Sequence, residues 1–288
     1  MCSGANASAA SAKLDVPIVL FLNFNRSHVR TKYKKKPGLA YARELNRILW
    51  FVESAKRVGT RLPLYVTVSG DRNASGEALL RSHGVSIVQN EFVEPPKWAS
   101  TFHHFSFTRI AALSLTQFRK VVVMDNDMAL LGNVDDLASD EARAPGMVWH
   151  TATVLPRKEH SAVTGGLFVL EPNLAEYKRA LHHLYYELNI KRTTDRAGRV
   201  QNQGVRCYDG SDQEFWRSFY RPIYELPLRY HAHQNLKMSN HEWHKIRVIH
   251  SISGFRAHDR SPPFVKKAMR YFDKPSASWV GGTSKHVR

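Results

Sequence analysis

The sequence predicts an α/β fold, with a mostly parallel sheet that is flanked by helices on both faces. Short apolar runs rich in β-branched residues alternate along the chain with segments of helical periodicity, which is the pattern of repeated strand–helix units. Polar residues follow several of these runs where a strand should end, the place where open α/β sheets bind ligands. At 288 residues and 43% hydrophobic content, the chain is long enough to bury a large core.

The elements follow from this pattern in chain order. Buried apolar runs predict strands at residues 16–22, 62–68, 85–88, 121–124, 147–149, 163–170 and 246–249. Helical spacing predicts helices at residues 40–58, 77–83, 105–115 and 173–188. The polar run 191–203 is predicted to be a mobile loop. We expect a single domain over residues 14–274, between flexible segments at 1–13 and 275–288.

The strand at residues 121–124 is followed directly by Asp125 and Asp127. Two residues apart in an extended segment, their side chains point the same way. Two like charges held so close are costly to bury unless a cation joins them. An Asp-x-Asp pair at the carboxyl end of a strand can hold a hard divalent cation and, through it, a phosphate. A solvated turn is the plainer interpretation of the pair taken alone.

Other strands also end in, or contain, residues suited to a site. Asn23 follows the first strand, and His250 follows the last one; a lone histidine in such a place is more often structural than a ligand. The glycine pair Gly165-Gly166 lies inside a predicted strand, where glycine often indicates close approach of the backbone to a ligand or another chain.

A capping-box pattern starts a further helix. Ser211 with Glu214 three residues later predicts the helix start, which puts Asp212 and Gln213 in the first turn. The backbone NH groups and the helix dipole there favour an ionised Asp212 and fix both side chains.

The chain carries 42 Lys and Arg against 25 Asp and Glu, a net charge of +17. Such a charge suits anionic partners, from phosphorylated substrates to acidic glycans, nucleic acid or a membrane surface. The basic run at 26–36 is interpreted first as a solvated face and second as an anion-binding loop. Only Cys2 and Cys207 are present, so a disulfide framework is not expected.

No apolar stretch is long enough for a membrane span, and residues 1–13 lack the apolar core of a signal peptide. We therefore expect a cytoplasmic location, or a Golgi-associated one if an anchor lies outside this sequence.

Four motifs occur in a fixed order from about Phe105 to Arg256. The ordered set resembles the family-8 glycosyltransferases, the group that contains glycogenin and bacterial lipopolysaccharide galactosyltransferases. The motifs are Phe107-Thr108-Arg109 with the segment 120–137, Gly210-Ser211-Asp212-Gln213, Leu226-Pro-Leu-Arg-Tyr230, and Val248-Ile249-His250 followed by Gly254 and Arg256.

The resemblance implies a GT-A fold and a retaining transfer of a hexosyl group from a UDP-sugar to a hydroxyl acceptor on a glycan, glycoconjugate or protein. It implies a metal site of Asp125, Asp127 and His250, for which a mixed oxygen and nitrogen set favours Mn²⁺, with Mg²⁺ as the second choice. Asp212 would hold donor hydroxyls, and Gln213 would lie near the anomeric carbon. The expected donor contacts are Asn23, Arg109, Asn126, Thr164, Gly165, Gly254 and Arg256.

The chain also departs from the family pattern. The family's Phe-Asn-Ser-Gly-Val reads Val163-Thr-Gly-Gly-Leu167 here, the asparagine after the Leu-Pro-x-x-Tyr motif is His231, and no Pro-Trp follows Arg256. These changes leave the sugar, acceptor and linkage open, and the oligomeric state is open too. Two other functions are kept: a metal-dependent nuclease or phosphodiesterase, and a catalytically silent nucleotide-sugar binder. No specific nucleic-acid partner is expected.

Overall fold

The computed structural model describes residues 15–28, 37–150, 162–188, 191–194, 200–203, 210–250 and 259–269. Its main sheet has seven strands in the order β10-β6-β7-β4-β1-β2-β3. Their bounds are β1 Ile18–Phe24, β2 Leu64–Gly70, β3 Ser86–Gln89, β4 Val121–Met124, β6 Gly146–His150, β7 Ala162–Leu170 and β10 Tyr224–Glu225. Strand β7 runs antiparallel to both β4 and β6, whereas the other pairs are parallel. The mostly parallel mixed sheet is confirmed.

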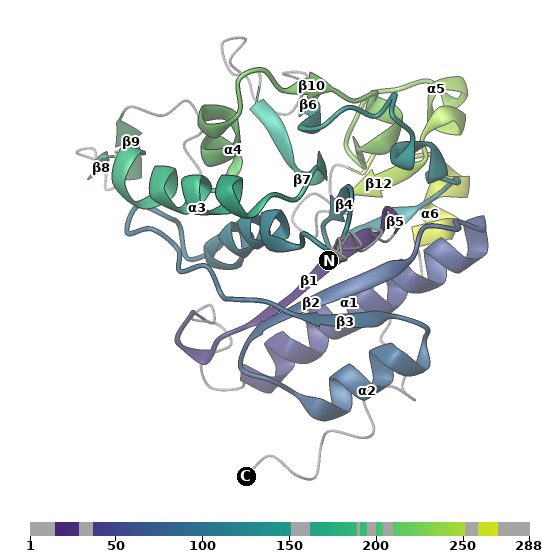
Figure 1. Cartoon of the computed structure of the whole chain (residues 1–288). Helices are drawn as coiled ribbons and strands as arrows, with labels where there is room; N and C mark the ends of the chain where they lie inside the picture. Colours follow the sequence, from purple (N-terminus) through teal and green to yellow (C-terminus); the bar gives the residue numbers. More distant parts are fainter. Residues whose placement is uncertain are drawn as a thin grey trace, which may run out of the picture.

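Helices cover both faces of this sheet (Figure 1). On one face lie α1 (Pro37–Val58) and α2 (Ala74–Ser82), and on the other lie the 3-10 helix η3 (His104–Ser114), α3 (Leu174–His182) and α4 (Gln213–Phe219). All seven residues of β1 are buried, and they alternate between the two cores. Leu20 packs on the α1 side and Phe21 on the η3 side, as the period of two in a strand requires.

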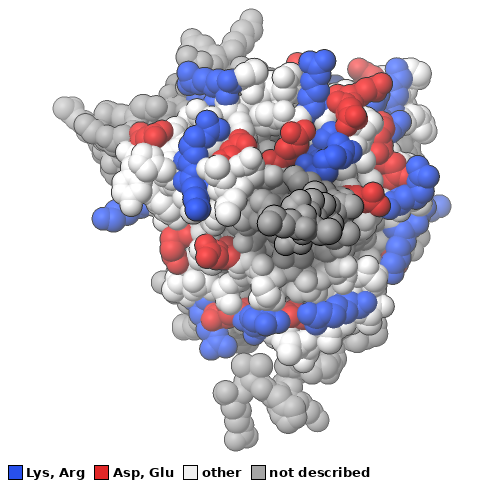
Figure 2. Space-filling model, in the orientation of Figure 1, with Lys and Arg blue, Asp and Glu red and all other residues white. Residues whose placement is uncertain are grey.

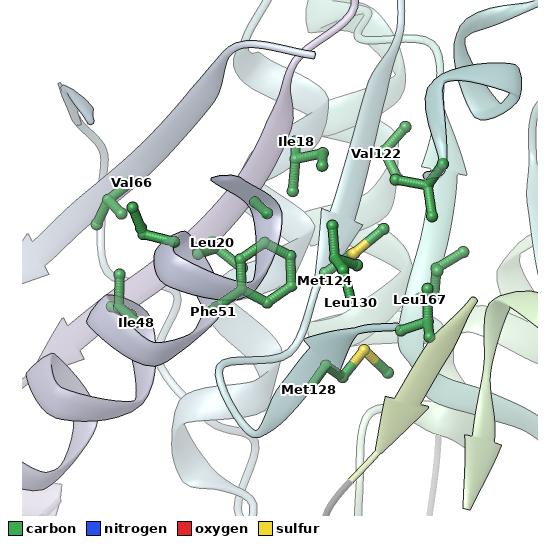
Figure 3. Close-up of a cluster of buried hydrophobic side chains, with 14 of the residues drawn as sticks. Ile18, Leu20, Ile48, Phe51, Val66, Val122, Met124, Met128, Leu130 and Leu167 are labelled. Atoms are coloured by element: carbon green, nitrogen blue, oxygen red, sulfur yellow. The ribbon is translucent and has the colours of Figure 1, made fainter. Parts of the chain in front are cut away.

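The core on the α1 side is drawn in Figure 3. Ile48 and Phe51 of α1 are fully buried against aliphatic side chains of the central strands, such as Leu20 and Val122. Met128 and Leu130, which follow the central strand, belong to the same cluster. The residues that lead out of β4 are therefore fixed by the main core on one side.

A smaller sheet lies beside the main one. It has the order β11-β12-β5, with β5 Met128–Leu130, β11 Ala232–His233 and β12 Val248–His250. Strand β12 pairs antiparallel with β5 and parallel with β11. A third core of apolar side chains joins this sheet to α5 (Asn240–Lys245) and α6 (Pro263–Met269). Because β4 ends at Met124 and β5 begins at Met128, Asp125 and Asp127 lie on the link between the two sheets.

Some elements differ from the sequence predictions. Within the expected loop at 191–203, β8 (Lys191–Thr194) and β9 (Val200–Gln203) pair as a two-stranded antiparallel sheet, so the loop prediction is wrong for these two segments. The loop was predicted from the polar composition of this run, although it contains β-branched residues such as Thr193, Thr194 and Val200, which favour strands. The helix predicted to reach 188 becomes a π turn, η5, at His183–Glu187.

The short elements complete the chain. They are the 3-10 turns η1 (Arg26–His28), η4 (Asp135–Ala138) and η6 (Leu228–Tyr230). Within the described ranges, no helix combines the length and the apolar character that crossing a membrane requires.

Candidate active site

The two carboxylates are delivered by the backbone at the end of β4. The amide of Asp125 donates to the carbonyl of Gly166 on β7 at 2.9 Å, and the amide of Met128 donates to the carbonyl of Asp125 at 3.2 Å. The first bond extends the β4–β7 ladder by one residue, and the second closes a tight turn over Asp127. The positions of both aspartates are therefore fixed by the sheet rather than by a free loop.

His250 reaches the same place from the smaller sheet. The antiparallel register places it opposite Met128, one residue beyond Asp127. Its Nε2 lies 3.0 Å from Asp127 Oδ1 and 4.0 Å from Asp125 Oδ2. One ligand atom from each of the three side chains lies within 4.8 Å of the others. The three residues expected to hold a metal are thus close enough together to do so.

The pKa values of the three side chains shift in different directions. Burial raises the pKa of Asp125 to about 6, although Arg109 acts against this rise. Burial also acts to raise the pKa of Asp127, but His250 and Arg47 outweigh it and hold that pKa below the usual range. Burial lowers the pKa of His250, and the carboxylate of Asp127 more than offsets this, so the net shift is upward. Of the three side chains, Asp125 pays most for its negative charge, because burial raises its pKa. A bound cation would therefore stabilise the ionised form of Asp125 most.

Arg109 on η3 connects Asp125 with the start of α4. Its Nη2 lies 2.8 Å from Asp125 Oδ1, and its Nη1 lies 3.3 Å from Asp212 Oδ2. Nη1 also donates to the carbonyl of Gly165. The residue expected to contact phosphate oxygens therefore lies between two carboxylates, and it brings Asp212 next to the Asp125–Asp127 pair.

The start of α4 differs from the predicted capping box. The helix begins at Gln213 with Asp212 at the N-cap position, and the Asp212 side chain does not cap it. Ser211 Oγ accepts from the amide of Gln213 at 3.3 Å, so its hydroxyl still serves the first turn. Asp212 Oδ2 instead accepts from Trp216 Nε1 at 3.0 Å. The side chain of Asp212 is thus buried and fixed, as expected, but by Trp216 and Arg109 rather than by the cap.

Gly165 faces this group from β7. A Cβ on Gly165 would lie 3.2 Å from Arg109 Nη1, 3.2 Å from Gln213 Cγ and 3.4 Å from Asp212 Oδ1. The groups that approach this glycine closely belong to the chain itself, and the predicted approach to a ligand or another chain stays a prediction. Thr164 beside it is 1% exposed.

The two asparagines bind backbone. Asn23 Nδ2 donates to the carbonyl of Phe105 at 3.2 Å, and Asn23 Oδ1 accepts from Ser69 Oγ at 2.7 Å. Asn126 Nδ2 donates to the carbonyl of Phe21 at 2.7 Å. Both amides therefore tie strand ends together beside the site. Their role toward a donor stays a prediction.

Part of the predicted site lies outside the described residues, namely Gly254 and Arg256, as do residues 29–36 of the basic run. The start of that run forms the turn η1, where the amide of Arg26 donates to Asp71 Oδ2 at 3.0 Å. Figure 2 shows one face of the molecule, on which basic and acidic side chains are interspersed. The excess positive charge does not form a single block among the described residues of this face.

Three residues near the site were not among the site residues predicted from the sequence. Arg47 on α1 lies 3.6 Å from Asp127 Oδ2, and His231 Nε2 lies 2.9 Å from His250 Nδ1. His233 stacks on the His250 ring at 4.9 Å between ring centroids. The pattern His231-x-His233 was the available signal, since alternate residues of a strand share a face.

The fold and the site can be compared with known proteins. No family model matches the chain. Among curated proteins it is 22% identical to galactinol synthase 1 of Ajuga reptans, over 70% of this chain and 66% of that protein. It is 27% identical to glycogenin-1 of Oryctolagus cuniculus, over 44% of this chain and 30% of that protein. The matched regions thus span less than two thirds of the length of these relatives.

Among solved structures, the galactosyltransferase LgtC with donor and acceptor sugar analogues aligns at a TM-score of 0.52 and 13% identity, over 92% of this chain and 99% of its own. The glycosyltransferase GlyE of Streptococcus pneumoniae TIGR4 aligns at a TM-score of 0.54 and 12% identity, over 90% of this chain and 60% of its own. At such identity these likenesses establish the fold. The fold is thus that of GT-A glycosyltransferases, and the order of the motifs and the curated relatives make the chain similar to family-8 glycosyltransferases.

Proposed function

We propose that this protein is a retaining glycosyltransferase that moves a hexosyl group from a UDP-sugar to a hydroxyl acceptor with the help of a divalent metal. The observation that carries the proposal is the convergence of Asp125, Asp127 and His250 at the exit of β4. The aspartates lie on the link after β4 and His250 lies on β12 of the smaller sheet, and they meet where an open α/β sheet binds its ligands.

The residues fit a divalent transition metal. Two carboxylates and one imidazole form a mixed oxygen and nitrogen set, which suits Mn²⁺ better than Ca²⁺ and leaves Mg²⁺ as the second choice. The Asp125 carboxyl, whose pKa burial raises to about 6, would be stabilised as a carboxylate by such an ion. When bound, the cation would offset the negative charge that develops on the leaving diphosphate.

The remaining side chains have roles that follow from their positions. Arg109 would place a fixed positive charge beside the diphosphate, and Arg256 stays the second candidate for that role. Asp212, held by Trp216 and Arg109, would accept hydrogen bonds from donor hydroxyls. Gln213 packs beside Gly165 and would lie near the anomeric carbon.

A retaining outcome then favours attack from the same face of the sugar. An amide such as that of Gln213 is too weak a nucleophile for an easy covalent intermediate. We favour departure of the diphosphate through an oxocarbenium-like state, with the acceptor hydroxyl giving its proton to the leaving phosphate. The Asp212 and Gln213 side chains would hold the sugar in place during this step.

A panel of UDP-sugars with Mn²⁺ tests the proposal, because slow hydrolysis of the donor needs no acceptor. Release of UDP from at least one sugar, lost on chelation, is the expected result. Cleavage of nucleic acid that depends on metal, without turnover of any UDP-sugar, would favour the nuclease alternative. Tight binding of UDP with no hydrolysis and no transfer would favour a silent binder.

A further inference from the structure

A second group of possible metal ligands adjoins the first. It consists of His231, His233 and His250, whose ring nitrogens lie within 4.8 Å of one another. His233 is paired with His250 in the parallel β11–β12 register, and His231 lies two residues before His233. A His-x-His segment and a histidine of the next strand therefore point at one spot.

The three rings form a close triangle. Ring centroids are 4.8 Å apart for His231 and His233, 5.0 Å for His231 and His250, and 4.9 Å for His233 and His250. His231 and His233 are 1% and 5% exposed. Gly166 makes room for this group, since a Cβ there would lie 2.5 Å from His231 Nε2. The position of His231 is occupied by asparagine in the family pattern, so the cluster belongs to this chain rather than to the motif.

We propose that His231, His233 and His250 bind a Zn²⁺ ion at a site beside the Asp125–Asp127 pair. Zn–N bonds of about 2.0–2.1 Å and tetrahedral angles put neighbouring ligand nitrogens about 3.4 Å apart. The distance of 2.9 Å between His231 Nε2 and His250 Nδ1 needs to widen by only about half an ångström to reach that value. A ligand set of imidazoles alone selects Zn²⁺ or Cu²⁺ over Mn²⁺ and Mg²⁺, which prefer oxygen.

The two metal sites share His250 through different ring atoms. Nδ1 faces His231 at 2.9 Å, and Nε2 faces Asp127 at 3.0 Å. A neutral imidazole has one lone pair and one N–H. If Nδ1 binds zinc, Nε2 carries the proton and donates a hydrogen bond to Asp127. If Nε2 binds a metal at the aspartates, Nδ1 donates to His231. Occupation of one site therefore excludes the other, and Zn²⁺ would inhibit the enzyme in competition with Mn²⁺.

The zinc site itself stands on the histidine geometry, whereas the competition rests on the proposed function. The full-length protein, stripped of metal, is titrated with Zn²⁺ by calorimetry and with Co²⁺ by visible absorption. We expect one ion per chain at the histidines and a tetrahedral Co²⁺ spectrum. His233→Gln and His231→Asn should each weaken Zn²⁺ binding by more than about 100-fold, beyond the loss from an outer-shell change. The matched control is His241→Gln, at an exposed position of α5, which should leave it unchanged.

A reciprocal pair separates the two sites. Asp127→Asn should lose Mn²⁺ binding but weaken Zn²⁺ binding by no more than the roughly 10–100-fold of an outer-shell change, because Asp127 only accepts a hydrogen bond from the zinc ligand His250. His233→Gln should keep Mn²⁺ binding. Zn²⁺ affinity that is the same in folded His233→Gln and His231→Asn variants refutes the histidine site. A Zn²⁺ affinity that falls in Asp127→Asn but in neither histidine variant also refutes the histidine site. If UDP-sugar hydrolysis is never found while the Zn²⁺ titration behaves as expected, the proposed function fails and the zinc site stands.

Discussion

Replacing Gly165 by alanine tests whether the donor sugar lies beside α4. The new Cβ would lie 3.2 Å from Arg109 Nη1 and 3.2 Å from Gln213 Cγ, so these neighbours must each move by a few tenths of an ångström. Alanine in a strand gains about 0.5–1 kcal/mol over glycine from backbone entropy, which offsets this strain. We therefore expect a folded variant whose free energy of unfolding differs from that of the parent by less than about 1 kcal/mol.

Catalysis should suffer more than stability. A displacement of 1 Å at a reacting centre can cost about 10²-fold in rate, so a few tenths of an ångström at Gln213 and Arg109 should cost about 10-fold in kcat for UDP-sugar hydrolysis. UDP affinity, measured by calorimetry with Mn²⁺, should change by less than about threefold. Of the proposed diphosphate contacts only Arg109 shifts, by a few tenths of an ångström, while the aspartates and His250 keep their positions.

Two other glycines calibrate the result. Gly38 has no heavy atom within 4 Å of an added Cβ, so Gly38→Ala should leave kcat unchanged. Gly166→Ala would place a Cβ 2.5 Å from His231 Nε2, and it should lower the melting temperature where Gly165→Ala does not. An unchanged kcat in a folded Gly165→Ala variant would show that the sugar does not react beside Gly165 and Gln213.

Three further predictions address the metal, the chemistry and the stability of the fold. Asp127→Asn should abolish UDP binding that depends on Mn²⁺; calorimetry showing the parent affinity would contradict the metal assignment. Gln213→Ala should bind UDP normally yet lose about 10²-fold in donor hydrolysis, because its amide acts at the reacting centre; a parallel loss of UDP affinity would place it at the diphosphate instead. Glu77 is 1% exposed and accepts from Arg72 Nε at 2.9 Å and Nη2 at 2.6 Å, and these hydrogen bonds chiefly lower its pKa. Its stabilisation is present above its unfolded pKa of 4.5 and disappears as the pH falls through the lowered value. Glu77→Gln should therefore cost about 1–3 kcal/mol near neutral pH and much less in acid, and urea unfolding at several pH values measures the difference.

The sequence was sufficient for the parts of the site that a single strand determines. A buried run followed by Asp125 and Asp127 indicated a strand end with two carboxylates on one side, and the structure has both there. Glycine inside a strand pointed to a close neighbour at Gly165, and the structure has the side chains of Arg109 and Gln213 there. These inferences depend on contacts between residues near in sequence, where periodicity carries the information.

Contacts between distant segments could not be predicted in this way. The pairing of β12 with β5 brings His250 to Asp127, and no local pattern encodes that register. Arg109 was expected to contact the donor, but no pattern in the sequence indicated that it lies between Asp125 and Asp212. The capping box placed the helix start one residue early, because the Asp212 side chain is bound by Trp216 instead.

Because the link from β4 to β5 joins the two sheets, an ion bound there would affect how firmly the sheets are held together. Asp125 and Asp127 sit where the chain passes from the large sheet to the small one, and His250 is carried by the small sheet alone. An ion held by all three would brace the two sheets against each other. A ligand at 100 times its dissociation constant stabilises the form that binds it by about 2.7 kcal/mol. The small sheet should therefore exchange its amide hydrogens more slowly once Mn²⁺ binds, while exchange in β2 and β3, at the far edge of the large sheet, stays the same.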